Sequence, residues 1–209
     1  MINILIVYDD LDQEIGENAL LCYQHLAKAL SPNVHTAHIL QGGNCTSERV
    51  EHTIGTFEQK PFIFIAYSHG KEDKLISTHE TNGYVNTKNA YFFGESLFYT
   101  NACFTALELR NYLAHHNCKG YVGYAIEVIL PNDAQYDIFF TDCENAGIIH
   151  FLSTNDTLEA SCKKMGEKYK EVADELVSKN CNVLASILLG NLDGLVFEDK
   201  DSVTASFFF

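Results

Sequence analysis

The chain has 209 residues, of which 46% are hydrophobic, and a formal net charge of −14. This length and composition predict a single domain, residues 1–209, with enough apolar side chains for a sizeable core. Nucleic-acid backbones and anionic membranes repel so acidic a surface, so we expect neither as a partner. No apolar stretch approaches the roughly 20 residues that a membrane-spanning helix needs.

The first ten residues contain two aspartates and no basic region, so they predict a strand and not a signal peptide. The seven cysteines then indicate free thiols in a reducing, cytoplasmic compartment. No two of them have CxxC spacing, and the nine histidines form no HExxH motif. We therefore expect no metal site and no cofactor.

Apolar runs and helical periodicity alternate along the first half of the chain. They predict strands at 2–8, 34–40 and 61–67 and helices at 14–30 and 46–58. Asn82-Gly83 lies between two short β-like runs, 75–77 and 84–86, and this pattern is typical of a hairpin.

The second half continues the alternation. A strand at 96–101 precedes a helix at 104–116 and a strand at 120–125, and Pro131-Asn132-Asp133 opens another helix. Asp156 and Glu159 resemble the capping box of the longest helix. Two further strands are predicted at 182–189 and 194–198. The alternation predicts an α/β protein with a mostly parallel sheet and helices on both faces.

Two of the predicted strands lead into polar motifs. The strand at 61–67 is followed by Ser68-His69-Gly70, and the strand at 96–101 runs into Asn101-Ala102-Cys103. Parallel strands end at the same edge of a sheet, so His69 and Cys103 are expected side by side. A thiol beside an imidazole is the arrangement of a cysteine nucleophile and its base. Either residue alone is more simply explained by packing, but the pair favours catalysis.

The surroundings of Cys103 favour the same interpretation. If Phe104 begins a helix, the thiol lies at the helix N-terminus, where the dipole favours a thiolate. The amides of Cys103 and Gly70 are candidate donors to an oxyanion. By contrast, Cys22, Cys143 and Cys162 fall on apolar helix faces, where cysteine usually acts as a small hydrophobic residue.

These motifs resemble those of caspase-like (clan CD) cysteine proteases, and the chain is similar to the bacterial CHAT-type caspase-like domain. The segments 120–124, 134–140 and 188–191 resemble that family's next core strand, its aromatic helix, and its last strand and turn. The resemblance implies a three-layer caspase-hemoglobinase-like fold. It also implies a catalytic dyad of Cys103 and His69, an oxyanion hole that uses Gly70 and Cys103, and no metal in catalysis.

The resemblance further implies a regulated cysteine endopeptidase, or thiol protease. Its substrate would be a protein or peptide, and a separate sensor or activator protein would control it in bacterial antiviral defence or cell death. The interval between the two motifs is shorter than in many relatives, since it holds a hairpin where they often insert a helix as well. A catalytically silent caspase-like scaffold, acting as an interaction module, remains the alternative.

Four further residues are candidates for substrate binding. Asp9, Asp10 and Glu127 follow predicted strands at the catalytic edge. Asn101 stands where related enzymes selective for Arg or Lys often carry an aspartate. Such an acidic rim would favour a basic residue before the scissile bond. A solvated carboxylate rim on an acidic protein is the simpler interpretation.

Overall fold

A six-stranded sheet forms the centre of the computed structural model, which describes residues 1–131 and 133–209. The strand order is β2-β1-β3-β7-β8-β9, and the pairs from β2 to β8 are parallel, whereas β9 runs antiparallel to β8. The strands are β1 (Ile2–Tyr8), β2 (His35–Gln41), β3 (Phe62–Tyr67), β7 (Ser96–Thr100), β8 (Gly120–Tyr124) and β9 (Leu195–Asp199).

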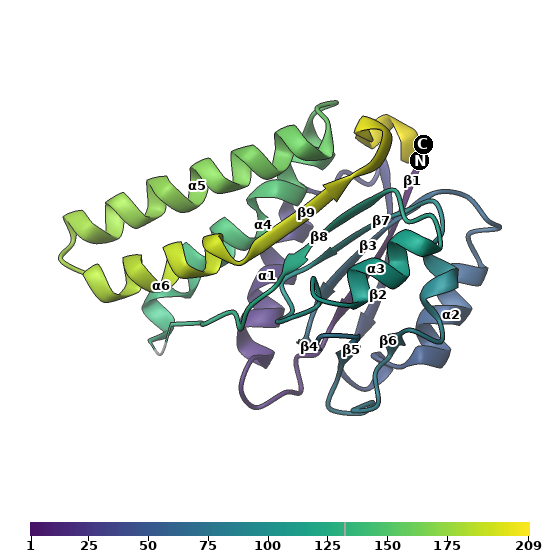
Figure 1. Ribbon diagram of the computed structural model, residues 1–209, viewed down its shortest axis with the longest axis horizontal. Helices are drawn as coiled ribbons and strands as arrows, with labels where there is room; N and C mark the ends of the chain where they lie inside the picture. Colours follow the sequence, from purple (N-terminus) through teal and green to yellow (C-terminus); the bar gives the residue numbers. More distant parts are fainter. Residues whose placement is uncertain (132) are drawn as a thin grey trace.

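Helices cover both faces of this sheet, in three layers (Figure 1). One face carries α1 (Gly16–Ala29), α4 (Asp137–Ser153), α5 (Leu158–Ser178) and α6 (Asn182–Asp193). The other face carries α2 (Ser47–Gly55) and α3 (Leu109–His115). The predicted α/β class, with a mostly parallel sheet between helices, is therefore confirmed. No helix in the described parts of the chain is long and apolar enough to cross a membrane.

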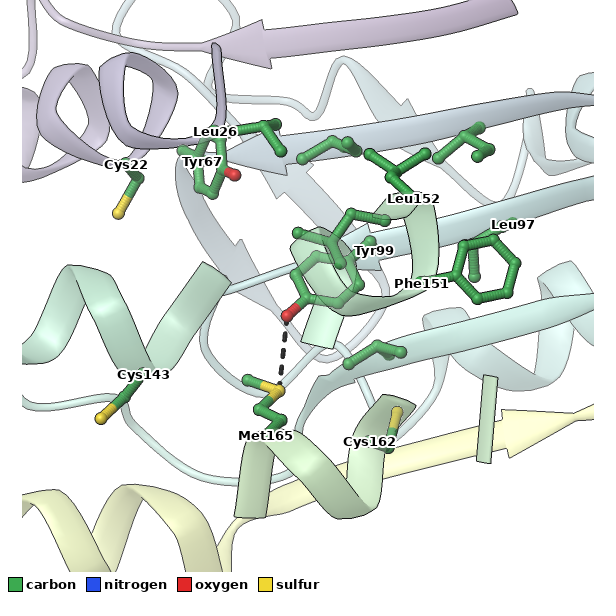
Figure 2. Close-up of a cluster of buried hydrophobic side chains, with 14 of the residues drawn as sticks. Cys22, Leu26, Tyr67, Leu97, Tyr99, Cys143, Phe151, Leu152, Cys162 and Met165 are labelled. Carbon is green, nitrogen blue, oxygen red and sulfur yellow. Dashed lines mark hydrogen bonds between the residues drawn. The ribbon is translucent and has the colours of Figure 1, made fainter. Parts of the chain in front are cut away.

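Strands β1, β3 and β7 are largely apolar because both of their faces are buried, whereas the edge strands β2 and β9 are partly exposed. Ile4 and Ile6 of β1 pack into the core beneath α1 and α4, whereas Leu5 and Val7 pack into the core beneath α2. Figure 2 shows the first of these cores, where the Tyr99 hydroxyl lies 3.4 Å from the sulfur of Met165 on α5.

A small antiparallel sheet lies beside the carboxyl ends of the central strands (Figure 1). It consists of β4 (His69–Lys71), β5 (Lys74–Ile76) and β6 (Val85–Asn86). The predicted hairpin is confirmed, with Leu75 opposite Val85. Gly83 has a φ of 106° in its turn, a conformation that favours glycine. The sequence did not predict β4, which begins at His69 itself.

Two predicted elements are wrong. Residues 182–189 belong to helix α6 and not to a strand, because a short apolar run without clear periodicity fits either element. Helix α3 begins at Leu109 and not at Phe104, whose φ of 61° is left-handed and interrupts a right-handed helix.

Smaller differences concern helix ends. The N-cap of α5 is Thr157, whose hydroxyl accepts the N–H of Ala160, whereas Asp156 contacts His150 at 2.8 Å. The N-cap is therefore one residue later than predicted, and the predicted capping box is wrong because Ala160 occupies its third helical position. Asn132, expected at the start of the fourth long helix, lies outside the described residues, and α4 follows a short 3₁₀ turn at Ala134–Tyr136.

Candidate functional site

The register of the central sheet brings the two sequence motifs to one place. Strands β3 and β7 are parallel neighbours, with Ala66 opposite Thr100. His69 and Cys103 each lie three residues beyond this last pair. The two residues therefore leave the sheet at the same level, from adjacent strands.

Gly70 packs directly against the chain around Cys103. A Cβ placed on Gly70 would overlap the carbonyl oxygen of Cys103 and would lie 2.8 Å from both the Ala102 Cβ and the Thr105 Cγ2. Only glycine permits so close a backbone approach. The predicted proximity of the two motifs is confirmed by this contact, which is made by the protein's own chain and not by a substrate.

His69 is held by a carboxylate that the sequence did not single out. Its Nε2 lies 3.3 Å from Asp12 Oδ1 and 3.8 Å from Glu14 Oε2. The N–H groups of Glu14 and Ile15 donate to the same Asp12 oxygen, at 2.8 and 3.0 Å. A ring whose Nε2 donates to Asp12 keeps Nδ1 for proton transfer.

The charge on Asp12 suits this role. Burial acts to raise the pKa of Asp12, but the two backbone hydrogen bonds and the attraction to His69 outweigh burial, so the pKa lies below its ordinary 3.8. Asp12 follows β1, the strand next to β3. Its place two residues after Asp10, at the same edge of the sheet, was the signal that could have identified it.

The thiol of Cys103 is partly covered in this structure. Its Sγ lies 3.2 Å from the N–H of Val128, which donates to it, and in the described parts of the chain Sγ and His69 share no hydrogen bond. Burial raises the pKa of Cys103 above 9.0, the Val128 N–H opposes this, and the charge of Glu127 adds to it. At neutral pH the resting side chain is therefore a thiol.

The expected helix-dipole effect on Cys103 is absent. Because α3 begins at Leu109, the residue after the cysteine is a turn residue, and Cys103 does not lie at the N-terminus of α3. The expectation that this helix dipole favours a thiolate was therefore wrong, whereas the N–H of Val128, which donates to Sγ, acts in that direction.

A buried carboxyl group lies behind the cysteine motif. Asn101 Nδ2 donates to Glu144 Oε2 at 3.0 Å, and Cys22 Sγ lies 3.1 Å from the same oxygen. The Glu144 side chain is 1% exposed, and its Oε1 has no partner within the described residues. Burial raises the pKa of Glu144 above its ordinary 4.5.

Replacing Glu144 by glutamine is expected to stabilise the fold at neutral pH. A carboxyl group whose pKa is raised on folding stabilises the folded state most below its ordinary pKa of 4.5. This stabilisation is lost as the pH rises through the folded pKa. Removing a buried, half-satisfied carboxylate relieves a cost of about 1–3 kcal/mol. Urea unfolding at several pH values should show a gain that grows from acid to neutral pH. Glu171→Gln, on the exposed side of α5, is the control, and an equal gain there would contradict the prediction.

The predicted acidic rim is mostly engaged within the protein. Asp9 is 1% exposed and accepts the N–H and the hydroxyl of Thr78 at 2.6 and 2.8 Å. Asp10 Oδ2 accepts the side-chain N–H of Gln41 at 2.6 Å. Asp9 therefore holds the loop after β5 through Thr78. Glu127, by contrast, is exposed near Cys103. A substrate role for Asp9, Asp10, Asn101 and Glu127 stays a prediction.

A cavity of about 400 Å³ lies next to the two motifs. It is lined by residues of the β4–β5 turn and by the residue after the cysteine: Lys71, Glu72, Asp73, Lys74 and Phe104. Concave surfaces of this size can hold a small group or a side chain. Over the described residues, no three His, Cys, Asp or Glu side chains group so as to hold a metal ion.

Fold and site together define an α/β protein whose mostly parallel sheet carries a histidine and a cysteine on neighbouring strand ends. A scan against protein-family models finds no match to the chain, and a search of curated proteins finds none either.

Proposed function

We propose that this protein is a caspase-like cysteine endopeptidase. The observation that carries the proposal is the contact of Gly70 with the Cys103 backbone, which joins the two strand ends. The Asp12–His69 pair supports it, because a histidine base is commonly oriented by a third group. The finer assignment to a caspase-hemoglobinase-like fold rests on the same arrangement and on the sequence resemblance.

The mechanism follows from the roles of these groups. The thiol of Cys103 loses its proton to Nδ1 of His69, and Sγ attacks the carbonyl carbon of the scissile peptide bond. The amides of Cys103 and Gly70 donate to the resulting oxyanion. His69 then protonates the leaving amine, and a water molecule hydrolyses the acyl-enzyme. Asp12 orients the imidazole and stabilises its cationic form.

The charges around the thiol favour a basic substrate residue. Glu127 is exposed near Cys103, so its negative field reaches the approach to the reacting sulfur. A lysine or arginine before the scissile bond would be attracted by this field. The cellular role that fits is a regulated cytoplasmic protease of a bacterial defence or cell-death pathway, acting with a separate sensor or activator.

Mapping of cleavage sites in a proteome tests the proposed activity. A cell lysate is treated with the wild-type protein or with Cys103→Ala, and new peptide N-termini are identified by mass spectrometry. We expect cleavage sites that appear only with the wild-type protein, with Lys or Arg enriched before the cut. Sites that are identical for both proteins would argue against a protease.

The alternative, a silent scaffold, is supported by one observation. The thiol is covered by Val128 and has a raised pKa, which is not the state of an active nucleophile. A peptide bearing an electrophilic trap separates the alternatives, because it reacts only where a thiol can be activated. A scaffold would stay unlabelled at Cys103 even when the protein is tested with candidate activators.

Replacing Asp12 by asparagine is expected to lower kcat/KM by about 10²- to 10⁴-fold. The amide oxygen of asparagine can still accept the N–H groups of Glu14 and Ile15, so the loop is kept while the negative charge beside His69 is lost. The loss should lie in kcat more than in KM, because Asp12 acts on the base and not on the substrate. A purely structural role would instead appear as a loss of folded protein, measured by circular dichroism.

The control for that substitution is Asp174→Asn, which removes an exposed carboxylate from α5. We expect it to leave kcat/KM unchanged. The pKa of Asp12 is depressed on folding, so its contribution to stability is present above pH 3.8 and is lost as the pH falls through the lower folded pKa. Acid unfolding of Asp12→Asn should therefore begin at a higher pH than that of Asp174→Asn.

A further inference from the structure

A connecting segment, Ile126–Ile129, leads from β8 towards α4 (Figure 1). Val128 of this segment contacts the thiol of Cys103. The N–H of Val128 donates to Sγ, and the carbonyl of Ile126 accepts the N–H of Phe104 at 3.1 Å. These contacts hold the segment against the chain around the cysteine. A substrate carbonyl cannot reach Sγ by the side that Val128 occupies.

One buried side chain holds this segment by two hydrogen bonds. Asn191, at the C-terminal end of α6, accepts the N–H of Ile129 at 3.0 Å and donates to the carbonyl of Ile129 at 2.9 Å. Asn191 is 2% exposed, so water does not compete for these bonds. An amide can donate and accept at once, which matches both polar groups of one residue.

The neighbouring backbone extends the attachment. The N–H of Ala125 donates to the carbonyl of Gly194 at 2.9 Å, and a Cβ on Gly194 would overlap the Ile126 side chain. The segment over the thiol is thus fastened to the junction between α6 and β9. Its position depends on that junction and not only on the strand that it follows.

We infer that Asn191 is a latch that holds the segment Ile126–Ile129 over Cys103 and keeps the thiol unreactive. Opening the latch removes Val128 from Sγ and returns the sulfur to solvent, where the burial that disfavours its thiolate is lost. The inference deepens the proposed function, on which its biological meaning rests, since it places the control of that site in α6. A partner that displaced the end of α6 would release the nucleophile.

Alkylation of the resting protein by iodoacetamide tests the latch without any protease assay. Asn191→Asp keeps the size of the side chain and an oxygen for the Ile129 N–H, but it loses the donor to the Ile129 carbonyl and places a negative charge beside it. We expect Cys103 in this variant to be alkylated about tenfold faster than in the wild-type protein, as followed by site-resolved mass spectrometry. The matched control is Asn182→Asp, the same change on the exposed first residue of α6.

Buried thiols report on unfolding in the same experiment. Cys45, Cys118 and Cys143 are buried and must stay unmodified if only the segment has opened. Reaction of all the thiols together would mean that the variant has unfolded. The test then moves to hydrogen exchange of the wild-type protein, in which the Val128 and Ile129 amides should exchange together and faster than the core.

The outcomes separate the latch from the proposed function. An unchanged or slower alkylation rate at Cys103 in folded Asn191→Asp overturns the latch, because Val128 would then be assisting the sulfur and not covering it. Separate exchange of the two amides overturns it as well. Faster alkylation of Asn191→Asp without any peptide cleavage would support the latch and count against the protease. Peptide cleavage with an unchanged alkylation rate would support the protease and count against the latch.

Discussion

Cys103→Ala is expected to lose all covalent capture by an electrophilic peptide trap and to cleave peptides at least about 10³-fold more slowly than the wild-type protein. The reason is that the sulfur forms the bond to the substrate, and neither His69 nor the oxyanion donors can replace it. Intact-protein mass spectrometry measures the capture as one added trap per chain. Stability should change little, because the cysteine side chain is only partly buried.

The matched control is Cys181→Ala, since Cys181 is the other partly buried cysteine of the described chain. This variant should be captured and should cleave like the wild-type protein. Loss of capture in Cys181→Ala, or capture that persists in Cys103→Ala, would show that the reactive thiol is not Cys103. Absence of capture in every protein and with every candidate activator would leave the scaffold as the better account.

Gly70→Ala is expected to lower the free energy of unfolding by about 1–3 kcal/mol and to abolish activity. A Cβ at this position would overlap the carbonyl oxygen of Cys103, which is backbone and cannot rotate away as a side chain would. The β4 strand must then move away from the cysteine loop. That movement separates His69 from Cys103 and displaces an oxyanion donor.

Urea unfolding and the trap assay together check this prediction, with Gly55→Ala as the control. A Cβ on Gly55, at the end of α2, would meet no atom within 4 Å, so the control should be neutral or slightly stabilised. If the two variants are equally stable and equally active, the close contact between the two motifs does not exist in solution.

Local sequence patterns were sufficient for most of the sheet. The runs at β1, β3 and β7 are continuous and apolar because both faces of each strand are buried, so each pattern has one simple interpretation. The hairpin of β5 and β6 was predictable from Asn82-Gly83, since few residues other than glycine adopt the backbone found at Gly83.

The errors arose where a local pattern allows two structures. The run at 182–189 is apolar enough for a strand, but it forms the helix α6, whose buried face packs on α5. The residues after Cys103 have a helical pattern, yet they make turns, because the N–H groups of Phe104 and Ala106 donate to the carbonyls of Ile126 and Tyr124. Tertiary hydrogen bonds outweigh helix propensity there.

The sequence by itself determined the α/β class, most strands of the central sheet and the placement of the His69 and Cys103 motifs at one edge, because these depend on hydrophobic pattern and on where parallel strands end. Only the tertiary structure decided that Asp12 holds the imidazole, that Glu144 lies buried behind Asn101, that Val128 covers the thiol, and that Asn191 binds the neighbouring Ile129. Each of these contacts joins loops or helices that are remote along the chain. Such contacts depend on how the layers pack, and no local pattern of residues specifies them.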